Sequence, residues 1–287
     1  MRSKLFVPAS RPELFSKAER SQADAISFDL EDAVEESRKE EARASLSAYL
    51  SRMTRGALGK TLIVRVNPAS SAHFLADLDA VALDTLDMIN LPMVESADEL
   101  RRAAQLLESA EARRGMTRRI GILVNIESPL GLHRAVEIAQ AHPRITGLQI
   151  GYGDLFAPMG IVSGEPAATQ AVRFAVKLAA TLAGIPAYDG AYVDIANPEG
   201  YRRDARAAHA LGYAGKSCIH PSQIEAANAI FRPAQEDIDH ALEVVRAAER
   251  AKQDGVGAFV VNGRLVDGPF IDEAYRIVEQ ARKLGLA

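Results

Sequence analysis

Acidic side chains stand where two short apolar segments of the sequence end. Glu127 follows residues 120–126, and Asp154 follows residues 147–153. A carboxylate beside a buried strand is costly unless it is paired or bound to a cation. Two carboxylates with open coordination positions suit Mg²⁺, which prefers oxygen ligands and keeps several waters. From the pattern alone, the alternative is that both carboxylates cap the following helices or pair with arginine.

A second acidic cluster and an arginine could form a substrate site. Asp29, Glu31 and Asp32 follow the apolar residues 25–28. We expect Asp29 and Asp32 to support the rim of a site, with helix capping an equal alternative for Asp32. Glu31 is expected to begin a helix. Arg65 lies among β-branched residues and needs an anionic partner, so we expect its planar fork to bind a ligand carboxylate or carbonyl oxygen. The alternative is a structural salt bridge to the acidic cluster.

Residues 215–221 carry three more reactive side chains. Lys216 could form a Schiff base with a carbonyl substrate, but a salt bridge is the favoured interpretation. His220 precedes Pro221 and is expected to hydrogen-bond at a strand-to-helix turn. Cys218 is the only cysteine and is expected to be a small core residue, which excludes an internal disulfide and a cysteine-rich zinc site.

An alternation of strands and helices must position these residues. Eight short segments, most of them apolar on both faces, have the pattern of strands in a covered parallel sheet. The predicted strands span residues 4–8, 25–30, 61–67, 88–91, 120–127, 147–153, 187–192 and 215–220. The predicted helices span residues 12–21, 35–50, 72–83, 97–114, 131–141, 166–182, 198–210 and 221–229.

This order predicts an α/β fold, a (β/α)₈ TIM barrel, in which the carboxyl ends of the strands form the active site. An open doubly wound sheet is the alternative, but no glycine-rich phosphate loop follows the first strand. Two extra helices are predicted over residues 233–253 and 271–284. We therefore expect a barrel over 1–230 and a C-terminal helical extension over 231–287, serving as a lid or subunit-contact arm.

Composition excludes several function classes. The 287 residues include 34 Lys and Arg against 38 Asp and Glu, a net charge of −4, which disfavours a nucleic-acid partner. No stretch approaches the roughly 18 apolar residues of a membrane span. The apolar residues near the N-terminus are too few for a signal peptide. We expect a cytoplasmic protein without a membrane partner.

Six motifs in order resemble the HpcH/HpaI aldolase family, in its citrate lyase β-subunit-like branch, which includes malyl- and citramalyl-CoA lyase-like proteins. The motifs are RSKLFVP (2–8), DLEDAV (29–34), VRVN (64–67), IESPLG (126–131), GYGDL (151–155) and GKSCIHP (215–221). One departure follows the fourth predicted strand, where Met93 replaces the family's usual lysine and cannot donate a charge-assisted hydrogen bond.

The resemblance implies a (β/α)₈ barrel that reversibly cleaves a carbon–carbon bond in a 3-hydroxy-acid thioester, such as a citryl, malyl or citramalyl thioester. The products would be an acyl thioester and a keto acid. It implies that Glu127 and Asp154 bind Mg²⁺, and that Arg65 and Glu127 bind the substrate and act in catalysis. Asp267 is the candidate general base, with a turn residue before Gly268 as the alternative.

The same resemblance implies a thioester carried by CoA or by a carrier protein, and a homo-oligomer, a trimer or hexamer. Three other functions are the alternatives. The first is an aldolase acting on a free hydroxy-keto acid. The second is malate-synthase-like or thioesterase-like turnover at the same site. The third is a non-catalytic barrel that binds acyl thioesters.

Overall fold

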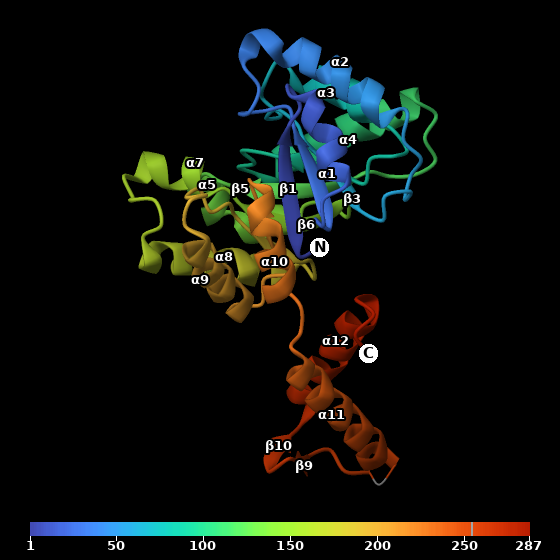
Figure 1. The fold of residues 1–287 in the computed structure, drawn as a ribbon, viewed down its shortest axis with the longest axis vertical. Helices are drawn as coiled ribbons and strands as arrows, with labels where there is room; N and C mark the ends of the chain where they lie inside the picture. The colour runs from blue at the N-terminus through green and yellow to red at the C-terminus, as the bar shows by residue number, and fades with distance from the viewer. Residues whose placement is uncertain (254) are drawn as a thin grey trace. The chain divides into compact units, whose positions relative to one another are not determined.

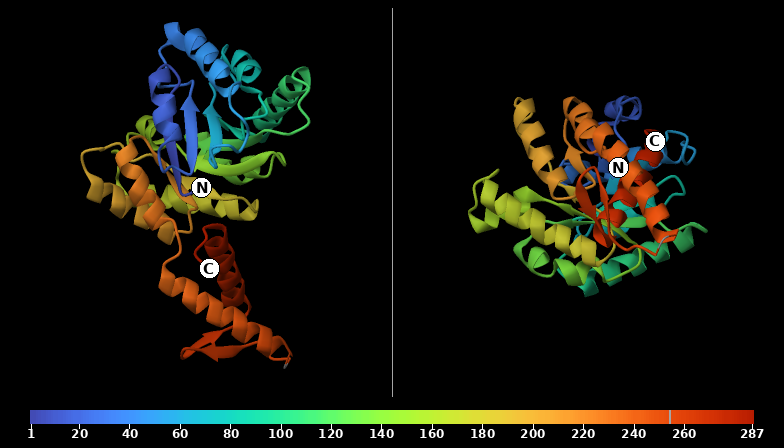
Figure 2. Two further views of the ribbon diagram at one scale, coloured as in Figure 1. Left: turned by 45° about the vertical axis from the view of Figure 1, so that its right-hand side comes forward. Right: turned by 90° about the horizontal axis from the view of Figure 1, so that it is seen from below.

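The computed structural model describes residues 1–253 and 255–287. The chain divides into two compact units, Met1–Phe231 and Arg232–Ala287, next to the boundary expected between residues 230 and 231. Figure 1 traces the chain through both units, and Figure 2 turns the same ribbon to two further views.

The first unit is a closed barrel of eight parallel strands in sequential order, which confirms the predicted (β/α)₈ fold. Hydrogen bonding between β1 and β8 closes it. The strands are β1 (Ser3–Pro8), β2 (Ala25–Asp29), β3 (Thr61–Arg65), β4 (Met88–Leu91), β5 (Gly121–Ile126), β6 (Ile145–Ile150), β7 (Ala187–Asp189) and β8 (Gly215–Cys218). Several end earlier than predicted, so Glu127 lies just beyond β5 and Asp154 lies in the helix that follows β6.

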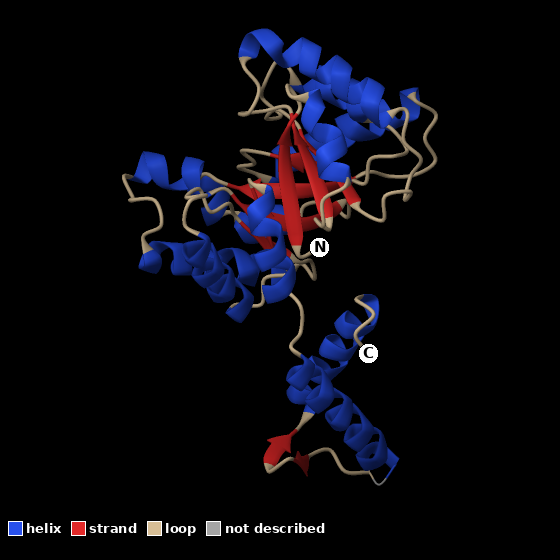
Figure 3. Cartoon of the chain, in the orientation of Figure 1, coloured by secondary structure: helices blue, strands red, loops and turns tan. Residues whose placement is uncertain are grey.

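Helices surround these strands (Figure 3), and η marks short 3₁₀ helices. They are η1 (Pro12–Leu14), α1 (Phe15–Glu19), η2 (Glu36–Arg38), α2 (Lys39–Leu50), α3 (Phe74–Val81), α4 (Ala97–Arg113), α5 (Pro129–His133), α6 (Ala135–Ala139), α7 (Tyr152–Phe156), η3 (Ala157–Met159), α8 (Pro166–Leu182), α9 (Pro198–Ala210), η4 (Pro221–Gln223) and α10 (Ile224–Ile230). Proline begins α5, α8 and α9, where its missing N–H leaves no helical bond unmade. The helix predicted over 131–141 is instead two short helices that meet at Arg134.

The barrel interior changes from apolar to polar towards the carboxyl ends of the strands. Ala25, Ile63, Leu123 and Tyr188 form an apolar cluster at the amino end. The larger core lies outside the strands, where the helices pack, and includes fully buried Ile26, Val64 and Ile89. The pocket described below therefore rests on a packed barrel.

The second unit contains α11 (Gln235–Gln253), β9 (Phe259–Val261), β10 (Arg264–Val266) and α12 (Gly268–Lys283). Val244, Val261, Val266 and Val278 are among the residues of its own small core. The two predicted helices are confirmed, but the segment between them also folds as an antiparallel hairpin. Asn262 and Gly263 make its turn with φ of 50° and 77°, the sequence signal for a two-residue hairpin loop. Among the described residues, no helix is both long and apolar enough to cross a membrane.

Candidate active site

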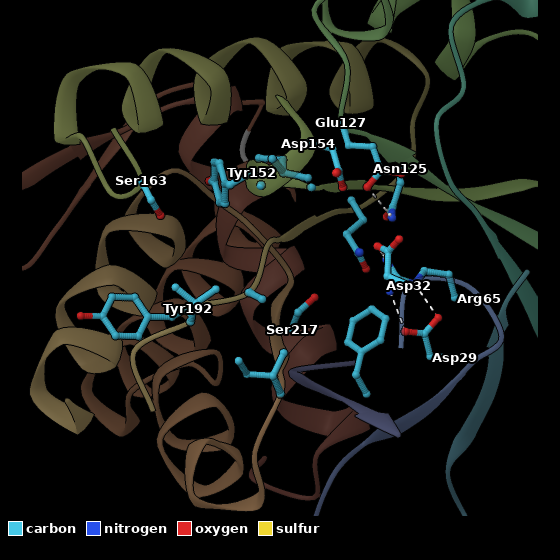
Figure 4. A pocket seen from close by; sticks show the side chains of 18 of the residues that line it. Asp29, Asp32, Arg65, Asn125, Glu127, Tyr152, Asp154, Ser163, Tyr192 and Ser217 are labelled. Carbon is cyan, nitrogen blue, oxygen red and sulfur yellow. Dashed lines mark hydrogen bonds and ion pairs between the residues drawn. The ribbon is translucent and has the colours of Figure 1, made fainter. Parts of the chain in front are cut away.

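A pocket of about 750 Å³ opens at the carboxyl ends of the barrel strands. Five of the six predicted site residues line it, and Figure 4 shows them with their neighbours. They are Asp29, Asp32, Arg65, Glu127 and Asp154. Barrel closure thus brings together residues at or after the ends of β2, β3 and β5 and in α7, which lie up to 125 positions apart in the sequence, 29 to 154.

Glu127 is held in place by two hydrogen-bond donors. It is 2% exposed, and its Oε1 accepts the backbone N–H of Met93 at 2.8 Å. Its Oε2 accepts Nδ2 of Asn125 at 3.1 Å. Burial raises the pKa of Glu127 to about 7, with Asp154 and Asp32 adding to the shift.

Met93 serves this site through its backbone. Its φ is 53°, a left-handed conformation that is uncommon for residues other than glycine. That conformation directs the N–H at Glu127. The departure from the family's usual lysine therefore leaves this contact with Glu127 in place.

Asp154 comes from the first turn of α7 and is exposed. Gly151, directly before α7, lies so close to Glu127 that an added Cβ would stand 2.2 Å from its Oε2. This close approach brings the start of α7 to Glu127, and the charge of Asp154 is one cause of the raised pKa of Glu127. Two neighbouring carboxylates that repel each other are an arrangement that a divalent cation relieves.

Arg65 is engaged by three carboxylates. Its Nε and Nη2 donate to Asp29 at 2.8 and 2.6 Å, a bidentate pair. Its Nη1 lies 2.7 Å from Glu31 and donates to Asp32 at 3.3 Å. Although burial acts against it, Asp29, Glu31 and Asp32 raise the pKa of Arg65. The salt-bridge alternative is therefore what the structure contains. The Nη2 of Arg65 keeps a second N–H beyond the one donated to Asp29, and Arg65 lines the pocket.

The expectation that Glu31 begins a helix is wrong. The next helix, η2, starts at Glu36. Glu31 is instead 8% exposed and paired with Arg65, and burial raises its pKa to about 8. Asp32 does not start a helix either and lies on the pocket wall. Sequence reasoning missed the role of Glu31 because only the register of β2 against β3 brings it to Arg65.

A buried ion network supports the other side of the pocket. Asp189, at the end of β7, is 0% exposed and accepts hydrogen bonds from Lys216, Arg173 and the hydroxyl of Tyr152. Asp204 lies 2.7 Å from Lys216 and 2.6 Å from Arg173. Burial would raise the pKa of Asp189, but Lys216 and Arg173 hold it below its ordinary value.

This network confirms the predicted ion pair of Lys216, because its Nζ contacts the carboxylates of Asp189 and Asp204. It also reaches α7, since Tyr152 is the first residue of the helix that carries Asp154. Arg173 was missed at the sequence level. The sequence feature that indicates its role is a charged residue on the buried face of α8, which also carries Val172 and Val176.

Two further predictions about residues 215–221 are confirmed. Cys218 is 0% exposed in the core. His220 stands before η4, where its Nδ1 accepts the backbone N–H of Ser222 at 3.3 Å. Neither residue is needed to form the carboxylate site.

Asp267 belongs to the second unit and is not among the residues that line the barrel pocket. It occupies the N-cap position of α12, and its backbone oxygen accepts the N–H of Ile271 at 3.0 Å. Its side chain makes no capping bond, and its Oδ1 is buried without a hydrogen-bond partner. Its role as a base stays a prediction.

Within residues 1–253 and 255–287, no group of three or more His, Cys, Asp or Glu side chains is arranged to hold a metal ion. Glu127 and Asp154 are a pair of oxygen donors beside an open pocket. They fit a cation such as Mg²⁺ that completes its coordination with waters and ligand oxygens.

Comparison with known proteins identifies the family. The model of the HpcH/HpaI aldolase/citrate lyase family matches residues 2–221. Citrate lyase subunit beta from Escherichia coli K12 is 37% identical over 99% of this chain and 94% of its own length. L-malyl-CoA/beta-methylmalyl-CoA lyase from Cereibacter sphaeroides ATCC 17025 is 34% identical over 99% of this chain and 95% of its own length. The CitE protein of Mycobacterium tuberculosis, solved with magnesium, acetoacetate and coenzyme A, superposes with a TM-score of 0.76 and 32% identity, covering 98% of this chain and all of that one. The chain belongs to the HpcH/HpaI aldolase/citrate lyase family.

Proposed function

We propose that this protein is a Mg²⁺-dependent lyase that cleaves a 3-hydroxyacyl thioester, carried by CoA, into an acyl thioester and a keto acid. The observation that carries the proposal is that Glu127, Asp154 and Arg65 share one pocket. Relatives named citrate lyase subunit beta and malyl-CoA lyase support it. The M. tuberculosis relative solved with magnesium and coenzyme A supports the choice of metal and carrier.

Glu127 and Asp154 would hold the metal. Mg²⁺ bound there would act as a Lewis acid on the oxygens of the keto-acid half of the substrate. The N–H of Met93 and the amide of Asn125 fix the orientation of the Glu127 carboxylate. Burial removes competing water, which strengthens every charge interaction in the pocket.

Cleavage breaks the bond between the carbinol carbon and the carbon next to the thioester carbonyl. The bonding electrons pass to the thioester, which becomes an enolate, and the hydroxyl proton leaves to a general base. Arg65, fixed by Asp29, would donate the remaining N–H of its Nη2 to the oxygen on which charge develops. A donor fixed before the reaction has no reorganisation to complete in the transition state.

We propose Asp267 as that base. Its buried Oδ1 accepts no hydrogen bond from the part of the chain that the structure describes, so no protein donor competes for it. An Asp267→Asn variant should lose at least about 100-fold in kcat, within the range of general-base catalysis, and keep Mg²⁺-dependent keto-acid binding. If Asp267 acts on a neighbouring copy in a homo-oligomer, mixing the D267N and E127Q proteins should restore part of the activity. Full activity of D267N by itself would exclude this base.

The proposed function is tested by product analysis. Wild-type protein with Mg²⁺ is incubated separately with malyl-, citramalyl- and citryl-CoA. We expect an acyl-CoA and a keto acid in equal amounts from at least one substrate, and no product with chelator or with E127Q. Free hydroxy acid without keto acid would indicate thioester hydrolysis, and turnover of a free hydroxy-keto acid would indicate an aldolase. Binding of the thioesters without any product would indicate a non-catalytic barrel.

A further inference from the structure

Lys4 has a buried amine that hydrogen-bonds to no acceptor among the described residues. It lies on β1 and is 2% exposed, and its Nζ has no hydrogen-bond partner. A buried ammonium without an anion is strongly unfavourable, so such a group is rarely retained without a partner. The other cation in this part of the pocket, Arg65, is already paired with Asp29.

The side chain of Lys4 lies on the same side of β1 as two residues of the pocket wall and is buried beneath the pocket. Side chains alternate along a strand, and Phe6 and Pro8, which follow Lys4 at steps of two, both line the pocket. The Nζ of Lys4 lies 4.6 Å from the centroid of the Phe6 ring, and the guanidinium carbon of Arg65 lies 5.3 Å from the same centroid. Both cations therefore contact one ring of the pocket wall.

Lys4 belongs to a layer of polar side chains inside the barrel. It pairs in register with Ser217 on β8, which lines the pocket together with Asn125 and Gln149. One or more buried side-chain atoms lack a hydrogen-bond partner in each of Ser27, Asn90, Asn125, Gln149 and Ser217. Unsatisfied polar groups that adjoin an open pocket are expected to meet water or ligand there.

The carboxylates nearest Lys4 do not hydrogen-bond to it. Burial and the charge of Arg65 lower the pKa of Lys4 well below its ordinary value, whereas Glu127 and Asp29 act in the opposite direction. Those carboxylates are committed elsewhere, to Met93 and to Arg65. A carboxylate brought to Nζ by a ligand would be its missing partner, and hydrogen bonds between charged groups are the stronger ones.

We infer that Lys4 selects the substrate, as the counter-charge for a second carboxylate in its keto-acid half. The inference rests on the proposed function, because the keto acid must first bind in this pocket. It narrows the substrate class to 3-hydroxyacyl thioesters that release a dicarboxylic keto acid rather than an alkyl one. A pocket built to bind a charged group rejects the analogue without that group, because its own buried partner is then left unpaired.

The test compares two four-carbon keto acids that differ at the distal carbon. Freshly neutralised oxaloacetate carries a carboxylate there and 2-oxobutanoate a methyl group. Each is titrated calorimetrically into the Mg²⁺-loaded protein. We expect wild-type protein to bind oxaloacetate about tenfold or more tightly than 2-oxobutanoate, the range of one charge-assisted hydrogen bond. Lys4→Met should remove that preference by weakening oxaloacetate binding alone.

Lys4→Gln keeps a polar side chain without the charge and should bind both acids as K4M does. It therefore provides the same test if K4M does not fold. Lys60→Met is the matched control, because Lys60 donates to backbone oxygens of Ser21 and Ala23 just before β3 and should not affect either ligand. Equal binding of the two acids by wild type, unchanged in K4M, would overturn the role of Lys4 and leave the proposed function standing. Absence of Mg²⁺-dependent binding of either acid would overturn the proposed function and this inference together.

Discussion

Replacing Glu127 by glutamine should stabilise the metal-free protein at neutral and alkaline pH. Burial is the main cause that raises the pKa of Glu127 from 4.5 to about 7. At ~1.36 kcal/mol per pKa unit, this shift corresponds to about 3 kcal/mol in the free energy of unfolding. The Glu127→Gln side chain does not titrate, and the Oδ1 of Asn125, which has no partner, can accept its amide if Asn125 turns over.

The sign follows from proton linkage. The folded protein holds this proton more tightly than the unfolded chain, since its folded pKa of about 7 lies above 4.5. The stability that the proton contributes is therefore fully present below pH 4.5, declines as the pH rises to about 7, and is absent above it. Between pH 5.5 and 7, wild type should lose about 2 kcal/mol relative to E127Q.

The assay is urea denaturation of both proteins in chelator at pH 5.5, 7.0 and 8.5. Glu137→Gln is the control, because Glu137 is an exposed glutamate on α6 and should leave the wild-type profile unchanged. In saturating Mg²⁺ the order should reverse, since a ligand at 100 times its Kd stabilises wild type by about 2.7 kcal/mol. If the free energies of unfolding of wild type and E127Q in chelator change with pH in parallel, burial does not raise the pKa of Glu127 and the reasoning is refuted.

Four other substitutions test the pocket and the ion network beside it. Asp154→Ala should abolish Mg²⁺ binding in calorimetry but change the free energy of unfolding by no more than about 0.5 kcal/mol, because Asp154 is exposed. Tyr152→Phe removes the 2.7 Å hydrogen bond to Asp189 and should weaken Mg²⁺ binding several-fold, with about 1 kcal/mol lost on urea denaturation; unchanged metal affinity would exclude a positioning role. Lys216→Met leaves Asp189 buried with less compensation and should lower the free energy of unfolding by about 3–5 kcal/mol, and a thermal midpoint equal to wild type would contradict the ion network. Arg65→Lys loses the bidentate geometry and should lower kcat/KM at least about tenfold in the lyase assay, whereas wild-type kinetics would contradict a substrate contact.

The sequence by itself determined the architecture and pointed to the two carboxylates that we propose hold the metal. Eight apolar segments alternating with helical ones specify a parallel barrel, because each element has to bury one side against the next. Local position marks Glu127 and Asp154, since each follows a short apolar segment of the sequence. The hairpin of the second unit has its own local signal in Asn262-Gly263.

The sequence does not show which charged residues pair with each other, because that depends on the register of neighbouring strands and on closure of the barrel. The pairing of Asp29 with Arg65 follows from β2 and β3 lying side by side with those residues opposite each other. Glu31 then falls beside Arg65, whereas its local sequence resembles a helix start. Arg173 reaches Asp189 from a helix, and no spacing along the chain predicts that contact.

Lys4 shows most clearly what only the tertiary structure decided. In the sequence it is the first residue of the strand predicted over residues 4–8, and its neighbours do not show which way its side chain points. Closure of β1 against β8 turns every second residue of β1 into the barrel and buries the Lys4 ammonium beneath the pocket. The physical reason is that burial of a side chain depends on which strands flank it, and that information is contained in long-range pairing rather than in neighbouring residues.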